Sequence, residues 1–239
     1  MEKTVAIVQS CYIPWKGYFD LIASVDEFIL YDDRQFTRRD WRNRNRIKTS
    51  QGTQWLTIPV ETKGRYHQRI DETEIGDGRW AESHWKTILH NYAAAPHFSQ
   101  YRDVIEDLYQ TSDERRLSLV NRRFLEGIMG LLGITTHLSW STDYDVEGAK
   151  TDRLVALCLA AGASEYLSGP RARSYLDEAA FAQAGIRVSY FDYSTYPEYP
   201  QLYPPFEHAV TAFDLILNTG RDARRYMTRA ADVLASQRA

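Results

Sequence analysis

Residues 4–33 read TVAIVQSCYIPWKGYFDLIASVDEFILYDD, and this stretch decides the fold. The run TVAIVQ (4–9) is short, apolar and rich in β-branched residues, which is typical of a buried strand. Apolar side chains then recur at helical spacing over 17–25, and a second apolar strand over 27–33 ends in two carboxylates. Strand, turn, helix and strand in this order predict the opening unit of a parallel α/β sheet.

The rest of the chain continues this alternation around a helical block. Periodicity and turn residues predict strands over 134–141, 165–169 and 186–193, and helices over 80–94, 97–110, 113–132, 151–162 and 177–185, with two more over 209–235. A β-hairpin turning at Gln51-Gly52 is predicted over 45–60, and an exposed polar loop over 61–78. We therefore expect one α/β domain over 1–239, with a mainly parallel sheet, a hairpin and a helical insertion at 79–133.

Two helix starts are predicted from capping residues. Thr111, Ser112 and Asp113 are the N-cap candidates of the helix over 113–132, because their side-chain oxygens can accept from free N–H groups. Thr151 or Asp152 is the expected N-cap of the helix over 151–162.

Composition narrows the class of protein. The chain has 239 residues, 44% of them hydrophobic, which is enough to bury a core. Its net charge of −3 argues against nucleic-acid binding through bulk charge, although it does not exclude a local basic patch. Neither Cys11 and Cys158 nor the six histidines have metal-type spacing, so no metal site built from cysteine or histidine is expected. The absence of a long apolar run predicts a cytoplasmic protein that does not enter a membrane.

Polar, cationic and aromatic side chains collect after the predicted strands. In open α/β sheets, ligands bind outside the carboxyl ends of the strands. The loops over 10–17, 32–46, 141–151, 168–176 and 193–206 are therefore the expected site. The candidate substrate-binding residues in and beside these loops are Gln9, Tyr12, Trp15, Gly17, Trp41, Asn43, Arg44, Asn45, Lys48, Ser168, Gly169 and Arg173.

The basic stretch 38–48 is the clearest local signal. Arginine makes bidentate contacts with phosphate, and tryptophan stacks on a base or a sugar ring. Period-two alternation predicts that Asn43 and Asn45 face one way and the neighbouring arginines the other. A solvated surface hairpin is an equal alternative. RNA binding through this stretch is a further one, which the acidic overall charge disfavours.

Two shorter features leave alternatives open. The segment SGPRARSYL (168–176) resembles a phosphate-binding turn, because small residues let a backbone approach and a helix start offers N–H groups. The alternative is an ordinary turn from strand to helix, which is the more common occurrence of such a segment. Asp32 and Asp33 could hold a metal, orient a ribose hydroxyl, act as a base or cap the following turn. No GxSxG, GxxxxGK[ST] or GxGxxG motif is present, so common hydrolase, P-loop and dinucleotide sites have no local support.

A combination of short motifs carries a family resemblance over nearly the whole chain. The motifs are Gln9-x-x-Tyr12-x-Pro14-Trp15-x-Gly17-Tyr18-Phe19, Tyr31-Asp32-Asp33, Trp41-x-Asn43-Arg44-Asn45-x-Ile47-Lys48, Thr151-x-Arg153-Leu154, Tyr166-Leu167-Ser168-Gly169-Pro170, Phe213-Asp214-Leu215 and Asn218-x-Gly220. Together they resemble the WbqC-like protein family. One departure is Gln9-Ser10, where the family usually has Gln-Pro, and a proline would have fixed the backbone there.

The resemblance implies an enzyme of O-antigen, other surface-polysaccharide or natural-product biosynthesis. It suggests a transferase that forms an amide by acyl or aminoacyl transfer to an amino sugar or a similar amine. The donor would be a thioester, an aminoacyl-tRNA or an acyl-adenylate, and the small-molecule substrate would bear phosphate. The resemblance does not identify a cofactor or an oligomeric state. A non-catalytic nucleotide- or glycan-binding accessory protein is the alternative.

Site roles rest on the motif match and the predicted placement. Asp32 or Asp33 would be the base, Tyr18 would stabilise the oxyanion, and Arg44, Lys48 and Arg173 would hold phosphate. Cys11 as an acyl-carrying nucleophile is a weaker alternative, because it has no evident histidine partner.

The first loop also has an analogue in another fold. In nucleotidyltransferase-like folds an HxGH turn after the first strand faces the nucleotide phosphates. Trp15-Lys16-Gly17-Tyr18 stands at that place here, which favours a nucleotidyltransferase-like or Rossmann-like fold and nucleotide binding. Because both histidines of the turn are absent, the sequence disfavours adenylyl transfer by that mechanism. The alternative is that Tyr12, Trp15 and Tyr18 simply pack beneath the hairpin.

Overall fold

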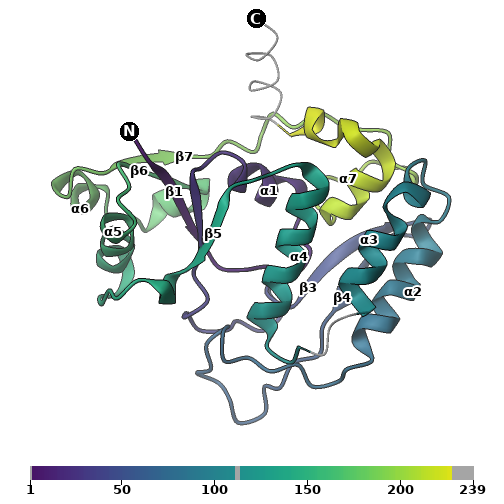
Figure 1. The fold of residues 1–239 in the computed structure, drawn as a ribbon, viewed down its shortest axis with the longest axis horizontal. Coiled ribbons are helices and arrows are strands. Elements are labelled where there is room, and N and C mark those ends of the chain that lie inside the picture. The colour runs from purple at the N-terminus through teal and green to yellow at the C-terminus, as the bar shows by residue number, and fades with distance from the viewer. Residues whose placement is uncertain (1, 111–113, 228–239) are drawn as a thin grey trace, which may run out of the picture.

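A five-stranded parallel sheet forms one half of the molecule (Figure 1). The computed structural model describes residues 2–110 and 114–227. The strands are β1 (Thr4–Val8), β2 (Glu27–Leu30), β5 (His137–Trp140), β6 (Glu165–Ser168) and β7 (Arg187–Tyr190). They lie in the order β5-β2-β1-β6-β7, and every neighbouring pair is parallel. The chain builds outward from β1 to β5 and then crosses to the other side of β1, so the direction of strand order reverses between β1 and β6.

Helices cover both faces of this sheet, which explains why its central strands β1 and β2 are mainly apolar. Val5, Ile7 and Ile29 pack with α5 (Lys150–Ala160) and α6 (Glu178–Gln183). Alternate residues such as Phe28 and Leu30 point the other way. They share the larger core with α1 (Lys16–Ile22), α4 (Leu117–Leu132) and α7 (Ala212–Thr219).

The chain between β2 and β5 forms the second half of the molecule (Figure 1). Its elements are the antiparallel hairpin of β3 (Arg44–Thr49) and β4 (Gly52–Thr57), followed by α2 (Trp80–Tyr92), α3 (Phe98–Gln110) and α4. Ile47, Ile88 and Phe124 belong to the same buried cluster as Phe28 of the sheet. The predicted helical insertion thus shares the core of the sheet. The assignment of 1–239 to one domain stays a prediction.

Two predicted helix starts and the hairpin turn are corrected by the structure. Helix α4 begins at Leu117, and the predicted caps Thr111, Ser112 and Asp113 lie outside the described residues. Helix α5 begins at Lys150 after Ala149, with no side-chain cap, because the helix starts before Thr151 can act as one. Gly52 is the first residue of β4, where its φ of 110° suits glycine, so the hairpin turns one residue earlier than predicted.

Two other segments also differ from the prediction. The loop over 61–78 is anchored rather than exposed throughout, because Ile70, Thr73 and Ile75 are buried. After α7 the chain forms a 3₁₀ turn at Gly220–Tyr226 instead of a second α-helix, and the end of that predicted helix lies outside the described residues.

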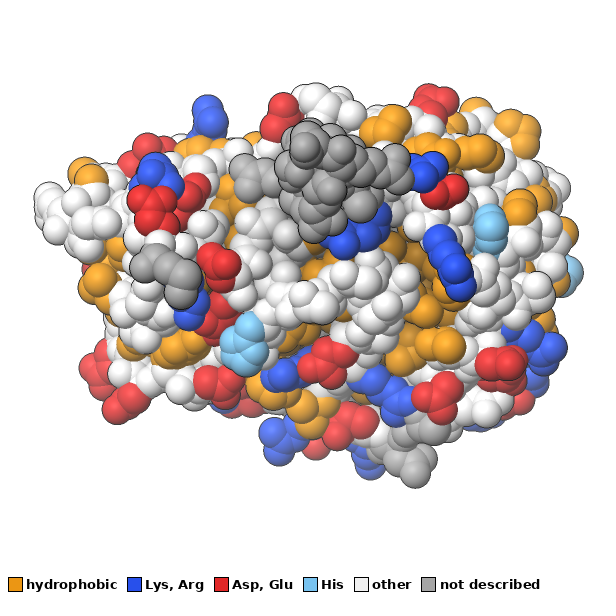
Figure 2. Space-filling view, turned by 45° about the horizontal axis from the view of Figure 1, so that its top comes forward, with side chains coloured by type: hydrophobic (Ala, Val, Ile, Leu, Met, Phe, Trp, Pro, Cys, Tyr) orange, Lys and Arg blue, Asp and Glu red, His pale blue; other side chains and the backbone are white. Residues whose placement is uncertain are grey.

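Acidic and basic side chains are interspersed over one face of the molecule, with hydrophobic side chains visible between them (Figure 2). This mixture agrees with the small net charge of −3. Within 2–110 and 114–227, no helix combines the length and apolar character that crossing a membrane requires.

Candidate functional site

A cleft of about 1290 Å³ lies at the carboxyl ends of the parallel strands. Residues that follow β1 and β6 form much of its wall, and these are the two strands between which the strand order reverses. Such a switch point is where open α/β sheets bind their ligands. The polar and aromatic side chains that line the cleft are Gln9, Cys11, Trp15, Tyr18, Tyr31, Arg34, Trp41, Arg42, Asn45, Lys150, Thr151, Tyr166, Ser168, Arg171, Tyr175 and Tyr193.

The charges in this lining are all positive. Arg34, Arg42, Lys150 and Arg171 line the cleft, and no aspartate or glutamate does. Arg34 is paired with a carboxylate at 2.8 Å and Arg42 with another at 3.7 Å. No carboxylate of the described chain forms an ion pair with Lys150 or Arg171. The cleft therefore offers two uncompensated cations to an anionic ligand.

Arg42 holds the loop between β1 and α1 in shape. Its Nη1 donates to the carbonyl oxygens of Gln9 and Ser10, at 3.1 and 3.2 Å, and lies 2.9 Å from Cys11 Sγ. The Tyr18 hydroxyl donates to the same Gln9 oxygen at 3.0 Å. Burial raises the pKa of the Cys11 thiol to about 11, although Arg42 opposes this, so the thiol is protonated near neutral pH. Burial likewise raises the pKa of Tyr18, which leaves a neutral hydroxyl that can donate.

Trp15 and its neighbours form an aromatic wall of the cleft. The ring of Trp15 lies so close over Gly17 that an added Cβ would stand 2.4 Å from it, which is why this turn requires glycine. Trp15 also contacts Tyr193 and Tyr196, with ring centroids 5.4 and 5.6 Å apart. A fixed indole beside cations suits a sugar or a base that carries phosphate.

The two predicted catalytic aspartates lie behind the cleft wall. Asp32 is 1% exposed; Oδ1 accepts from the Ser10 N–H at 2.8 Å, and Oδ2 accepts from the Ser118 hydroxyl. Burial raises the pKa of Asp32, and these hydrogen bonds oppose the shift. Asp33 accepts from Arg34, Arg153 and Ser141, and these partners lower the pKa of its carboxyl despite burial.

The chain is similar over most of its length to a known group of proteins. The profile of the WbqC-like protein family matches residues 9–226, which include the cleft lining apart from two residues of β1. The chain belongs to the WbqC-like protein family. It is also 55% identical over 225 residues to a protein of Mycobacterium tuberculosis (strain ATCC 25618 / H37Rv) named "Uncharacterized protein Rv1507c", covering 94% of this chain and 97% of that one. No solved structure matches it.

The cleft of this WbqC-like protein brings together part of the predicted site. The predicted residues that line it are Gln9, Trp15, Tyr18, Trp41, Asn45, Ser168 and Gly169. Gly17 lies directly beneath Trp15. Half of the stretch 9–18 and the start of the segment after β6 therefore line the same cleft.

The other predicted binding residues lie elsewhere. Tyr12 is fully buried with its hydroxyl 2.9 Å from His84 Nδ1. Asn43 donates to a backbone oxygen at 2.7 Å, and Lys48 Nζ donates to the Pro205 carbonyl. Two arginines pack on aromatic rings outside the cleft. These are Arg44, 4.2 Å from the Trp55 centroid, and Arg173, 4.5 Å from that of Tyr190.

The four cations that line the cleft, Arg34, Arg42, Lys150 and Arg171, were not among the predicted site residues. All four stand in loops that the sequence marked by their position after strands. In the sequence, Lys150 and Arg171 differ from other lysines and arginines in their position. Lys150 stands next to a helix start, and Arg171 follows Gly169-Pro170. Lys150 also has a φ of 50°, an uncommon conformation for a residue with a side chain, and such positions concentrate at functional sites.

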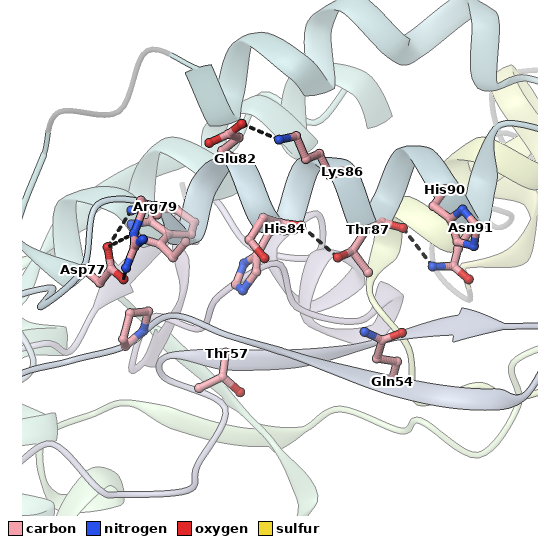
Figure 3. A pocket seen from close by; sticks show the side chains of 13 residues that line it. Gln54, Thr57, Asp77, Arg79, Glu82, His84, Lys86, Thr87, His90 and Asn91 are labelled. Atoms are coloured by element: carbon pink, nitrogen blue, oxygen red, sulfur yellow. Dashed lines mark hydrogen bonds and ion pairs between the residues drawn. The ribbon is translucent and has the colours of Figure 1, made fainter.

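A second, more open groove of about 840 Å³ lies between β4 and α2 (Figure 3). Its charged side chains are largely paired with each other: Asp77 accepts from Arg79, and Glu82 from Lys86. The groove thus offers less uncompensated charge than the cleft. In the part of the chain that the structure covers, no three His, Cys, Asp or Glu side chains gather in a way that could hold a metal ion.

Proposed function

We propose that this WbqC-like protein is an enzyme that forms an amide, by transferring an acyl or aminoacyl group to the amine of an amino sugar or a similar amine. The substrate bound in the cleft carries phosphate, as a nucleotide-linked sugar does. In this proposal the enzyme acts in the cytoplasm, in the biosynthesis of a surface polysaccharide such as O-antigen or of a natural product.

The observation that carries the proposal is a cleft at the strand-order switch point with cations and no carboxylate in its lining. A volume of about 1290 Å³ is ample for a nucleotide sugar. The same strand order supports the nucleotidyltransferase-like or Rossmann-like fold, which we propose on this basis.

The two ends of the cleft suit different parts of such a substrate. Lys150, Arg171 and the N-terminus of α5 would bind the phosphates, since that helix end lacks a side-chain cap. Trp15 and Tyr193 would stack on the ring. The reacting amine would then lie near Gln9 and Tyr18.

Tyr18 has the protonation state that the reaction requires. A neutral hydroxyl can donate to the oxyanion that forms when the amine attacks the acyl carbon. Its present acceptor is the Gln9 carbonyl, 3.0 Å away, so this role requires the hydroxyl to turn toward the ligand. We retain Asp32 as the proposed base. It accepts from the Ser10 N–H, so taking up the proton of the amine requires the loop after β1 to move and expose this carboxylate.

One observation favours the accessory-protein alternative. Both carboxylates considered as the base are occupied by protein groups, since buried Asp32 accepts from Ser10 and Ser118, and Asp33 is paired with two arginines. A protein that only binds a nucleotide or a glycan needs the cations and rings of the cleft but no base. The alternative predicts binding without turnover.

Thermal unfolding in the presence of ligands tests the proposal. The panel is UDP- and dTDP-amino sugars, ATP, coenzyme A and glycine, each with and without magnesium. A ligand at a hundred times its dissociation constant adds about 2.7 kcal/mol of stability, which raises the midpoint visibly. We expect a nucleotide amino sugar to raise it, and Arg171→Ala to reduce the shift.

The matched control is Arg102→Ala, which removes an exposed arginine of α3 paired with Glu106 at 3.7 Å. Its ligand shift should equal that of the wild type. Amide formation is then followed by mass spectrometry with acyl donors of the three classes. Midpoints that do not move with any phosphate-bearing ligand would remove the cleft as the substrate site. Binding without any amide product would favour the accessory protein.

A further inference from the structure

Two tryptophans and two arginines form a cluster on the outer face of the β3–β4 hairpin. We call Trp41, Arg44, Arg46 and Trp55 the Trp–Arg cluster. The rings of Trp41 and Trp55 have centroids 5.3 Å apart. The Arg44 guanidinium lies 4.2 Å from the Trp55 centroid, and that of Arg46 lies 5.7 Å from it. Arg46 and Trp55 are direct cross-strand partners, so the hairpin itself fixes the alternation of flat rings and cations.

The two tryptophans of the cluster are exposed, and its two positively charged arginines are half-buried. Trp41 is 40% and Trp55 is 42% exposed, although tryptophan is usually well buried. No ion pair joins Arg44 or Arg46 to a carboxylate within the described ranges. The Nε atoms of both arginines are buried without a hydrogen-bond partner, and Arg44 Nη2 donates to the Arg39 carbonyl. Asp40 lies next to the cluster, but its carboxylate is 3.7 Å from Arg42.

The cluster continues into the cleft. Trp41 itself lines the cleft, as does Asn45, which stands between the two arginines along β3. The backbone of Trp41 accepts from the Tyr12 N–H at 3.1 Å, which fixes the hairpin to the loop after β1. A chain molecule lying on the cluster can therefore extend its end to Gln9 and Tyr18.

We propose that the Trp–Arg cluster binds the unpaired 3′ end of an RNA that carries the acyl group. Exposed rings stack on successive bases without a need for one sequence, and guanidinium groups contact the phosphates between them. A base-paired duplex hides its base faces, so the cluster selects a single strand. This inference rests on the proposed function, for which it names the class of donor.

The transfer needs no other reactant. The amine nitrogen bonds to the acyl carbon, and the ester bond from that carbon to the ribose oxygen breaks. The proton lost by the amine ends on that oxygen, which leaves as the RNA hydroxyl. No atom is oxidised or reduced.

Fluorescence anisotropy with a labelled 12-nucleotide single-stranded RNA tests the inference, with a blunt RNA duplex of equal length beside it. We expect the single strand to bind and its affinity to fall as salt rises, with a logarithmic slope of about −0.7 for each phosphate contacted. Trp55→Ala should weaken binding about tenfold, and Trp55→Phe should keep most of it. Arg46→Ala should make the salt slope shallower, by about one phosphate contact.

Arg102→Ala is again the control and should bind RNA as the wild type does. A duplex that binds as tightly as the single strand would overturn the inference. So would wild-type affinity in both Trp55→Ala and Arg46→Ala. Trp55 does not line the cleft, so Trp55→Ala should keep the thermal shift with nucleotide amino sugars. If Trp55→Ala loses RNA binding but keeps this thermal shift, the inference about RNA is tested separately from the proposed function.

Discussion

At the scale of single residues, the charge of Asp32 can be removed by mutation while its hydrogen bonds are kept. Its two oxygens accept from the Ser10 N–H and the Ser118 hydroxyl, and both partners are buried. Asparagine can keep both contacts, because its oxygen accepts and its amide group can donate to the serine oxygen. We expect the free energy of unfolding of Asp32→Asn to lie within about 1 kcal/mol of the wild-type value. If Asp32 is the base, the same variant loses amide formation.

Asp32→Ala is the matched comparison. It leaves two buried donors without acceptors, which costs about 3 kcal/mol or more. Urea unfolding at pH 7 measures both variants, and the amide assay follows activity. Turnover that persists in a folded Asp32→Asn would show that the carboxylate only positions the loop after β1.

The sequence pattern predicted the orientation of side chains better than it predicted their function. Asn43 and Asn45 are 7% and 3% exposed, as the period-two pattern predicted. Yet Asn43 bonds to the Ile58 carbonyl, and Asn45, although it lines the cleft, donates to that of Tyr12. A buried amide is equally suited to a backbone oxygen and to a ligand, and only the fold shows which one lies within reach.

At the scale of elements, His84 of α2 joins the helical block to the loop after β1. Its Nδ1 lies 2.9 Å from the Tyr12 hydroxyl, which lies 2.8 Å from that of Tyr109. Burial lowers the pKa of His84 to about 4. The folded state therefore binds fewer protons than the unfolded one below pH 6.5, where an exposed histidine titrates.

The consequence is a loss of stability in mild acid. The contribution of neutral His84 is fully present above pH 6.5 and falls as the pH drops toward about 4. Over that range we expect the free energy of unfolding to decrease by up to about 3 kcal/mol. Denaturant unfolding at several pH values measures it, and His84→Gln should flatten the curve. His67→Gln, an exposed histidine, should leave the curve unchanged.

The elements were largely predictable, and their ends were not. The apolar runs at 4–9 and 27–33 correspond to β1 and β2 because strands buried on both faces need apolar residues throughout. The start of α5 was missed because its N-terminus has no capping side chain, so sequence signals for a cap pointed to later residues. The end that lacks a cap is the one that lines the cleft.

At the scale of the molecule, the sheet edge that holds the cleft followed from the strand–helix alternation alone. Parallel strands bring their following loops to one edge, so residues far apart in sequence were expected to meet there. Which side chains line the cleft was only partly predictable. Arg42 lies two residues before Arg44, the first residue of β3, yet Arg42 holds the loop of the cleft and Arg44 packs on Trp55. The packing of the hairpin against that loop, which sequence does not display, makes the difference.

The two cores of the molecule are joined by a buried ion pair. Asp33 follows β2, and Arg153 belongs to α5, which packs on the opposite face of the sheet from α4. Their side chains are 7% and 11% exposed and 2.5 Å apart, and Arg153 also donates to the Val146 carbonyl. We expect Arg153→Met to cost about 3 kcal/mol, because it leaves a buried carboxylate with one fewer partner. Lys86→Met, which breaks an exposed pair, should change stability by less than about 1 kcal/mol.

The difference between wild type and Arg153→Met should also depend on pH in one direction. The pKa of Asp33 is lowered from 3.8 in the folded protein, so the carboxylate's contribution is fully present above that value. It is lost as the pH falls through the lowered pKa, where the folded protein takes up the proton. Urea unfolding of both proteins between pH 7 and pH 3 should show a constant gap that narrows only at the acid end. A gap that narrows near pH 6 would mean that a histidine, and not Asp33, controls the junction between the two cores.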